Sequence, residues 1–101
     1  MNKQFEGKVA FISGGTSGLG KATVYELVKR GARVIFVGRD DAKAQEVINK
    51  CKELGGEAEY KNCDITKHQN VIDVFGYIRE RYGKLDFAGN VAGTGIPSTQ
   101  I

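Results

Sequence analysis

The 101 residues are enough for one domain with a buried core. Hydrophobic residues make up 41% of the chain, which is too many for a disordered polypeptide. The net charge of +3 is scattered rather than clustered, and no apolar stretch approaches the ~20 residues of a membrane span. We therefore expect neither a nucleic acid nor a membrane as a partner.

Apolar segments and turn residues alternate in a regular order from the start of the chain. The first apolar run predicts a strand over about residues 8–13, and a helical pattern follows from 18 to 30 and ends at Gly31. We expect its inner face to carry Leu19, Ala22, Thr23, Leu27 and Val28. Residues 33–38 are almost continuously apolar, which is typical of a strand buried on both faces.

The next pair of elements repeats this order. Asp40 or Asp41 is placed to cap a second helix, and Gly55-Gly56 ends it. Its apolar positions follow helical spacing: Ala44, Val47, Ile48, Cys51 and Leu54. Residues 57–62 predict a third strand.

A third helix and a fourth strand complete the pattern. Thr66, with Gln69 three residues later, is a capping-box signature for a helix that ends at Gly83. Its expected apolar stripe is Val71, Ile72, Phe75, Ile78 and Tyr82. The fourth strand is predicted over about residues 85–89.

Strands and helices that alternate at these lengths predict an α/β fold with a parallel sheet and right-handed crossovers. The expected strand order is 3-2-1-4, with a ligand at the switch point between the first and fourth strands. The first two helices then cover one face of the sheet and the third covers the other. Residues 1–101 are thus interpreted as the first half of a doubly wound fold.

A glycine-rich turn joins the first strand to the first helix. Residues 13–20 read Ser-Gly-Gly-Thr-Ser-Gly-Leu-Gly. Glycine lets the backbone approach a ligand, and the free N–H groups and dipole of a helix start attract phosphate. The turn therefore predicts a pyrophosphate site, a variant of the dinucleotide fingerprint, against the alternative of a plain glycine-rich loop. The residues expected to contact the cofactor here are Gly14, Thr16, Ser17, Gly18, Leu19 and Gly20.

The end of the second strand bears on the choice of nicotinamide cofactor. An acidic residue there would bind the ribose hydroxyls of NAD, but this chain has Gly38 followed by Arg39. Glycine leaves room, and arginine can pair with a 2′-phosphate through two parallel bonds. We therefore favour NADP(H) over NAD(H). Two alternatives stay open: Asp40 acts as the ribose acid, or Arg39 is simply a solvated loop residue.

Polar and small residues also follow the third and fourth strands. Asp64, which precedes Ile65, is placed either to accept the adenine amino group or to brace the turn at Thr66. After the fourth strand, small residues would let the backbone approach the cofactor ribose, unless they form an ordinary turn. The residues expected to contact the cofactor at these two ends are Asp64, Ile65, Asn90, Ala92 and Gly93.

Taken in order, these motifs resemble those of the short-chain dehydrogenase/reductase family. Residues 13–20 are similar to its Thr-Gly-x-x-x-Gly-x-Gly motif, with Ser13 in place of threonine. Gly38-Arg39 resembles the family's NADP-preferring form, and Asp64 matches its adenine-contacting aspartate.

The resemblance continues to the end of the chain. Residues 90–93 are similar to the family's Asn-Asn-Ala-Gly motif, with Val91 in place of the second asparagine. The likeness covers about residues 5–97 and implies a Rossmann-type fold. It implies the cofactor-binding part of an enzyme that transfers hydride between a nicotinamide and a carbonyl or alcohol substrate.

The catalytic residues that the resemblance implies fall outside this sequence. The family's serine, Tyr-x-x-x-Lys pair and helix-borne asparagine are expected beyond Ile101, so no catalytic residue is assigned and the chain alone is expected to be inactive. In the family's mechanism the tyrosine passes a proton to or from the substrate oxygen. Tyr25 and Lys29 have the same spacing, but they lie on the first helix, away from the expected nicotinamide.

The two cysteines, Cys51 and Cys63, are isolated and lack metal-ligand spacing. They are interpreted as reduced thiols of a cytoplasmic protein, although the sequence leaves a disulfide open. The early apolar run is also too short for a signal peptide, and no metal site is expected.

A shortened doubly wound fold would leave one face of its sheet half covered. The fourth strand would then be a bare edge beside an apolar patch. We expect self-association through this edge and patch, with Phe11 and Phe87 among the contacts. Two other functions stay open: a noncatalytic nucleotide-binding module and an interaction module without a ligand. A methyltransferase is disfavoured, because its ribose-binding acid should also end the second strand.

Overall fold

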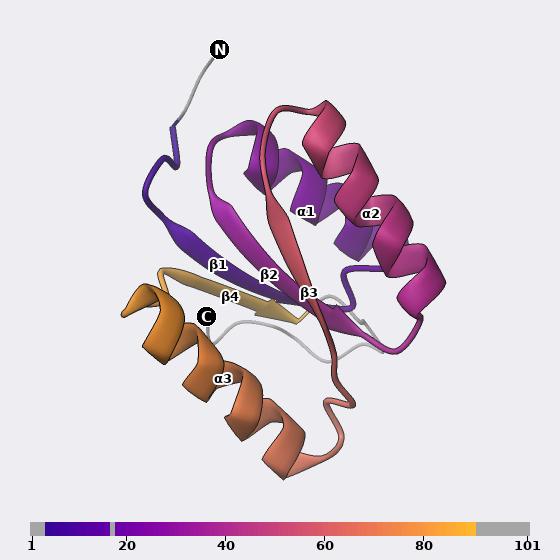
Figure 1. Cartoon of the computed structure of the whole chain (residues 1–101), viewed down its shortest axis with the longest axis vertical. Helices are drawn as coiled ribbons and strands as arrows, with labels where there is room; N and C mark the ends of the chain where they lie inside the picture. Colours follow the sequence, from indigo (N-terminus) through magenta and orange to yellow (C-terminus); the bar gives the residue numbers. More distant parts are fainter. Residues whose placement is uncertain (1–3, 17, 91–101) are drawn as a thin grey trace.

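The computed structural model describes residues 4–16 and 18–90, in which strands and helices alternate (Figure 1). The strands are β1 (Val9–Ser13), β2 (Arg33–Gly38), β3 (Ala58–Asn62) and β4 (Phe87–Asn90). The helices are α1 (Gly18–Lys29), α2 (Asp41–Glu53) and α3 (His68–Tyr82). All the predicted elements are present in the predicted order.

The four strands form one parallel sheet in the order β3-β2-β1-β4, which confirms the predicted topology. Ser13 is in register with Val37 on one side and with Asn90 on the other, and Gly38 is in register with Asn62. The carboxyl ends of all four strands therefore meet at one edge of the sheet. The residues that follow them come from distant parts of the sequence.

Helices α1 and α2 cover one face of the sheet and α3 covers the other (Figure 1). The side chains of β2 alternate between the two layers: Val34 and Phe36 pack under α1 and α2, whereas Ile35 and Val37 pack under α3. All four are fully buried. The apolar run of residues 33–38 is thus explained by a strand that contributes to both cores.

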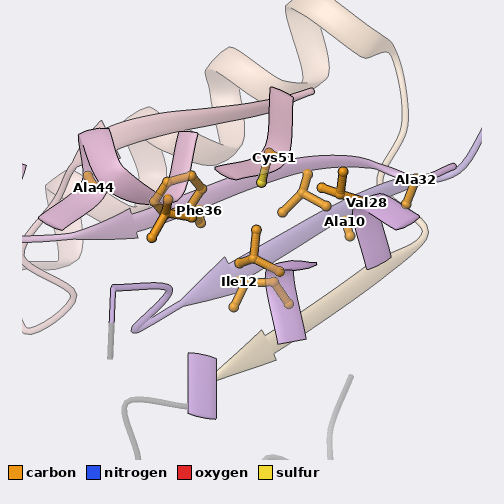
Figure 2. Packing of buried hydrophobic residues seen from close by; sticks show 10 residues of the cluster. Ala10, Ile12, Val28, Ala32, Phe36, Ala44 and Cys51 are labelled. Atoms are coloured by element: carbon orange, nitrogen blue, oxygen red, sulfur yellow. The ribbon is translucent and has the colours of Figure 1, made fainter. Parts of the chain in front are cut away.

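The larger core lies between the sheet and the α1–α2 pair, and Figure 2 shows how its side chains interlock. It includes Cys51, whereas Cys63 belongs to the core under α3. Both cysteines are buried and free, and because they lie on opposite faces of the sheet, they form no disulfide with each other. Burial raises the pKa of the Cys51 thiol to about 11 and also raises that of Cys63.

The predicted inner faces of two helices were partly wrong. Helix α1 buries Gly20, Val24 and Val28, while Leu19 and Ala22 are exposed. Helix α3 buries Val74 and Ile78, whereas Ile72 and Phe75 are exposed. In both helices the buried residues are spaced four apart, so a single i, i+4 row faces the sheet. The apolar stripe in the sequence is wider than the surface that the sheet covers.

The two phenylalanines predicted as contacts between copies are engaged within the chain. Phe11 is buried under α3, where its ring packs edge-on against Phe75 at 4.9 Å between centroids, so its prediction as a surface contact was wrong. Phe87 is half-buried and packs edge-on against Phe5 at 5.3 Å. The exposed apolar side chains near α3 are instead Ile72, Phe75 and Leu85.

The predicted capping box at Thr66 is not formed. The N-cap residue of α3 is Lys67, which makes no side-chain capping bond. Thr66 donates its hydroxyl to Asp64 Oδ1 at 2.6 Å, and Gln69 donates to Asp73 within the helix. The Thr66 hydroxyl thus acts as a donor to Asp64, whereas a capping box would use its oxygen as the acceptor of a helix N–H.

The edge strand β3 presents a charge to α3. Glu59 accepts hydrogen bonds from the hydroxyls of Tyr77 and Tyr82, and the Lys61 ammonium lies 3.8 Å from the centre of the Tyr77 ring. Partial burial disfavours the charge of Glu59, but the two tyrosine bonds outweigh it and lower its pKa. This cluster attaches the second half of α3 to the edge of the sheet.

Asp86 joins the amino ends of β1 and β4. Its Oδ2 accepts a 2.8 Å hydrogen bond from the backbone N–H of Val9, and its own N–H donates to the Val9 carbonyl at 2.8 Å. The bond from Val9 lowers the pKa of the Asp86 carboxyl, and Lys84 at 3.4 Å adds to this. The carboxylate thereby contributes to the pairing of the two strands.

Replacing Asp86 by Asn should weaken the fold in a pH-dependent manner. A carboxyl whose pKa is lowered by folding stabilises the protein above its unfolded pKa, ordinarily 3.8, and this contribution is lost as the pH falls through the folded value. Asp86→Asn should therefore be less stable than wild type at neutral pH, and the difference should shrink below pH 3.8. Thermal unfolding measured across this range, with the surface variant Asp73→Asn as the control, tests it. A difference that is the same at every pH would contradict the assigned role.

A close contact between helix α1 and the turn that joins α2 to β3 leaves no room for a side chain at Gly56. A Cβ atom on Gly56 would lie 2.3 Å from Val28 Cγ1 and 3.2 Å from the Val28 carbonyl oxygen. Because Val28 is fully buried in the larger core, it has little room to move. The absence of a side chain at position 56 therefore sets how closely α1 approaches this turn.

Gly56→Ala should destabilise the fold by about 1–3 kcal/mol, the usual cost of overpacking. Gly76→Ala is the matched control, because a Cβ on this α3 residue meets nothing within 4 Å. It should leave stability unchanged or raise it by roughly 0.5–1 kcal/mol, since alanine favours a helix. Urea unfolding of the two variants compares these effects, and equal stabilities would refute the close contact.

Candidate functional site

The glycine-rich turn is held against β2 by the backbone. Gly14 adopts φ 73°, a conformation that glycine favours, and its N–H donates to the Val37 carbonyl at 3.1 Å. The N–H of Gly15 donates to the same carbonyl at 3.3 Å. The turn therefore has a defined position relative to the ends of β1 and β2.

Position 15 has no room for a side chain, a constraint that the sequence interpretation missed. A Cβ atom at this position would lie 2.7 Å from Phe36 Cβ and 2.8 Å from Phe36 Cδ2. Phe36 is fully buried in the larger core, so the turn lies directly on the core. The sequence does show a glycine directly after Gly14, but nothing local indicates that this glycine meets Phe36, which is distant along the chain.

Helix α1 begins at Gly18, immediately after this turn. Its first-turn N–H groups have no acceptor within the helix, and its dipole adds partial positive charge at this end. A Cβ on Gly18 meets nothing within 4 Å, and Leu19 is 69% exposed, so the helix start is open to solvent. Gly20 is buried against the sheet, and Ser17 lies outside the described residues.

An exposed cation follows the end of β2. The Arg39 side chain is 72% exposed, and its Nη1 lies 3.5 Å from Asp64 Oδ2. Asp40 is the N-cap of α2, where its Oδ1 accepts from the Lys43 N–H at 3.1 Å. This confirms the interpretation of Asp40 as a helix cap.

Asp41 belongs to a hydrogen-bond cluster that fixes the loop after β2. Its Oδ1 accepts from Tyr60 and from Asn62, each at 2.8 Å, and the Tyr60 hydroxyl also lies 3.1 Å from the Gly38 carbonyl. The bonds from Asn62 and Tyr60 lower the pKa of Asp41, whereas burial raises that of Tyr60 to about 12. Sequence reasoning could not find this cluster, because Asp41 at the start of α2 is about 20 residues from its partners on β3.

Asp64 braces the turn that follows β3. Its Oδ1 accepts from the N–H of Thr66 at 3.0 Å and from the hydroxyl of the same residue, and these bonds lower its pKa. Cys63 donates its N–H to the Gly38 carbonyl at 3.0 Å, which draws this loop toward the end of β2. One of the two predicted roles of Asp64, the bracing of the turn, is therefore observed, and Ile65 beside it is exposed.

The fourth strand brings its carboxyl end to the same edge. Asn90 pairs with Ser13 through the backbone register, and Gly89 lies near Ile12. Ala92 and Gly93 lie outside the described residues. The turn, Arg39 and Asp64 thus meet at one edge of the sheet, as predicted, and the described part of the fourth-strand motif joins them.

The surroundings of the tyrosines suit a role in the fold rather than in proton transfer. The hydroxyls of Tyr60, Tyr77 and Tyr82 all bond carboxylates, and burial raises the pKa of Tyr25 on α1. A tyrosine that exchanges protons near neutral pH needs a lowered pKa.

Within residues 4–16 and 18–90 there is no group of three potential metal ligands, and no helix there is long and apolar enough to cross a membrane.

An edge that combines backbone N–H groups, an exposed guanidinium and a carboxylate can hold a ligand with phosphates and a polar ring. The N–H groups and helix dipole suit a pyrophosphate, and the guanidinium suits a further phosphate. In doubly wound sheets this edge is where dinucleotides bind.

Comparison with known proteins agrees with this geometry. The family described as short chain dehydrogenase matches residues 8–101. The chain is 39% identical over 90 residues to a 3beta-hydroxysteroid dehydrogenase of Mediterraneibacter gnavus, covering 89% of this chain and 33% of that protein. It is 38% identical over 104 residues to tropinone reductase-like 1 of Erythroxylum coca, covering 99% of this chain and 37% of that protein. The chain thus spans about a third of the length of these relatives.

Solved structures give the same result. A metagenomic short-chain oxidoreductase in complex with NADP superimposes with a TM-score of 0.86 at 32% identity, covering 90% of this chain and 41% of that one. An NAD+-bound xylitol dehydrogenase gives a TM-score of 0.79 at 27% identity, covering 84% and 33%. With its sheet order, its turn and these relatives, the chain belongs to the short-chain dehydrogenase/reductase family.

Proposed function

We propose that the chain is the cofactor-binding part of an NADP(H)-dependent oxidoreductase. The observation that carries the proposal is the exposed Arg39 guanidinium at the end of β2, directly after Gly38, which lies against Thr16 of the glycine-rich turn. The nearest carboxylate in the sequence, Asp40, is committed to capping α2. Asp64, whose Oδ2 lies 3.5 Å from Arg39, is bonded to Thr66 through its Oδ1. An exposed guanidinium in this position favours a 2′-phosphate over a ribose hydroxyl.

The residues present fit a nicotinamide dinucleotide. The backbone of the turn and the start of α1 would hold the pyrophosphate, Arg39 the 2′-phosphate, and Asp64 with Ile65 the adenine side of the ligand. Asn90, Ala92 and Gly93 are proposed to border the ribose. The cofactor, when bound, supplies or accepts a hydride, and the residues of this chain bind and orient it.

The proposed reaction transfers a hydride between the nicotinamide and a carbonyl or alcohol substrate, and its proton-transfer residues are expected beyond Ile101. Tyr25 is no substitute, because it packs against the larger core. We therefore propose that these 101 residues bind cofactor but do not turn over substrate alone. A noncatalytic nucleotide-binding module would give the same result with this chain, and turnover by a longer form separates the two.

A cytoplasmic location is also part of the proposal. Cys51 and Cys63 are buried free thiols in separate layers of the fold, and burial raises the pKa of each. This arrangement suits a reducing compartment, in which neither cysteine needs a partner.

Arg39→Gln tests the cofactor preference directly. Wild type should bind NADPH more tightly than NADH, and the variant should lose about tenfold or more of its NADPH affinity, since a charge-assisted hydrogen bond contributes about 1.5–3 kcal/mol. Affinity for NADH should hardly change. Fluorescence titration of the reduced cofactors measures both, with Arg79→Gln on α3 as the control for charge. Equal binding of NADPH and NADH by wild type would contradict the proposal.

We also propose that the chain associates with itself through the α3 side of the sheet. Ile72, Phe75 and Leu85 are exposed there, and Phe75 is 38% exposed although its ring contacts Phe11. Exposed apolar groups that lie close together favour association.

Light scattering should then give a mass above 11.0 kDa that rises with concentration. Ile72→Lys should lower this mass, because it places a charge among the apolar side chains. Ala42→Lys, which adds the same charge to the exposed side of α2, should not. A wild-type chain that stays a monomer at all concentrations and binds no hydrophobic dye would refute this association.

A further inference from the structure

The end of β2 has a steric partner in the glycine-rich turn. A Cβ atom on Gly38 would have Thr16 as its nearest neighbour: 3.2 Å to Oγ1, 3.5 Å to Cγ2 and 3.9 Å to Cβ. The three nearest atoms thus all belong to one side chain. Gly38 has no positive φ, so its backbone does not itself demand glycine.

Neither backbone is free to give way. The Gly38 carbonyl accepts from the Tyr60 hydroxyl at 3.1 Å and from the Cys63 N–H at 3.0 Å. On the other side, the turn that carries Thr16 is held by the bonds of Gly14 and Gly15 to Val37, and Gly15 lies against Phe36. A Cβ at position 38 therefore requires the side chain of Thr16 to shift by a few tenths of an ångström.

This contact bears on cofactor choice, because position 38 is where an NAD-type site would carry its ribose-binding carboxylate. We propose that Thr16 is a second residue that determines cofactor specificity, acting through position 38. Its side chain fills the space that an acidic residue at the end of β2 would need, and it thereby keeps this place available for a 2′-phosphate beside Arg39. The inference rests on the proposed function, since it assumes that the site binds a nicotinamide dinucleotide.

The specificity test uses adenosine ligands that lack the nicotinamide: 2′,5′-ADP for the NADP type and 5′-AMP for the NAD type. Gly38→Asp should weaken 2′,5′-ADP binding by about tenfold, because the new carboxylate repels the 2′-phosphate and occupies its space. The affinity of this variant for 5′-AMP should rise by less than about twofold. Thr16→Ala combined with Gly38→Asp should gain roughly fivefold or more for 5′-AMP over Gly38→Asp alone, since the new carboxylate then has room. Thr16→Ala alone measures what the contacts of Thr16 itself contribute to each affinity, and the gain of the double variant is counted beyond that change. Calorimetric titration of the full chain measures all four proteins.

The matched control is Thr16→Val combined with Gly38→Asp. Valine keeps the shape of threonine and removes the hydroxyl, so this variant should remain as poor for 5′-AMP as Gly38→Asp. The inference is overturned if Gly38→Asp alone gains as much 5′-AMP affinity as the double variant with alanine. It is also overturned if the valine double variant gains equally, because the hydroxyl rather than the volume would then be responsible.

A stability cycle without ligand separates this inference from the proposed function. Gly38→Ala should lower the melting temperature by roughly 4 °C or more, and Thr16→Ala in the same chain should restore most of the loss. No loss in Gly38→Ala, or no recovery in the double variant, overturns the steric contact. If wild type binds neither adenosine ligand, or prefers 5′-AMP, the proposed function fails whatever the stability cycle gives.

Discussion

The position of the candidate site depends on one backbone carbonyl. The oxygen of Val37 accepts the N–H groups of both Gly14 and Gly15, so the glycine-rich turn is fixed relative to the end of β2. This geometry is reached only because the turn has no side chain where it meets Phe36. The placement of the turn thus follows from the packing of the core below it, and the start of α1 takes its direction from the same contact.

The end of β2 is also fixed through one backbone carbonyl, that of Gly38. The Gly38 carbonyl accepts from the Cys63 N–H and lies 3.1 Å from the Tyr60 hydroxyl, which shares its one proton with Asp41 at the start of α2. Two segments that are far apart in the sequence, residues 38–41 and 60–63, are therefore connected near Arg39. Such a network fixes the backbone of Gly38, from which the chain continues into Arg39.

Much of this arrangement could be predicted from the sequence because its signals are local. The apolar run of β2, the glycines after β1 and the cap at Asp40 each depend on neighbours within a few residues. The remainder could not be predicted from local patterns. It comprises the contact of Gly15 with Phe36, the hydrogen bond of Thr66 to Asp64 in place of a capping box, and the single row of α3 side chains that faces the sheet. Periodicity indicates that a helix has an apolar side, but the shape of the sheet decides which residues of that side are covered.

Glu59 has a consequence for the outer edge of the sheet. An edge strand offers unpaired backbone groups to any other extended chain, and proteins often protect it with charge. In β3, the carboxylate of Glu59 is bonded by Tyr77 and Tyr82, and Lys61 lies over the ring of Tyr77. A further strand added here would remove water from two charges and from the tyrosines that hold them. The same side chains that attach α3 thereby disfavour fibre-like growth of the sheet beyond β3.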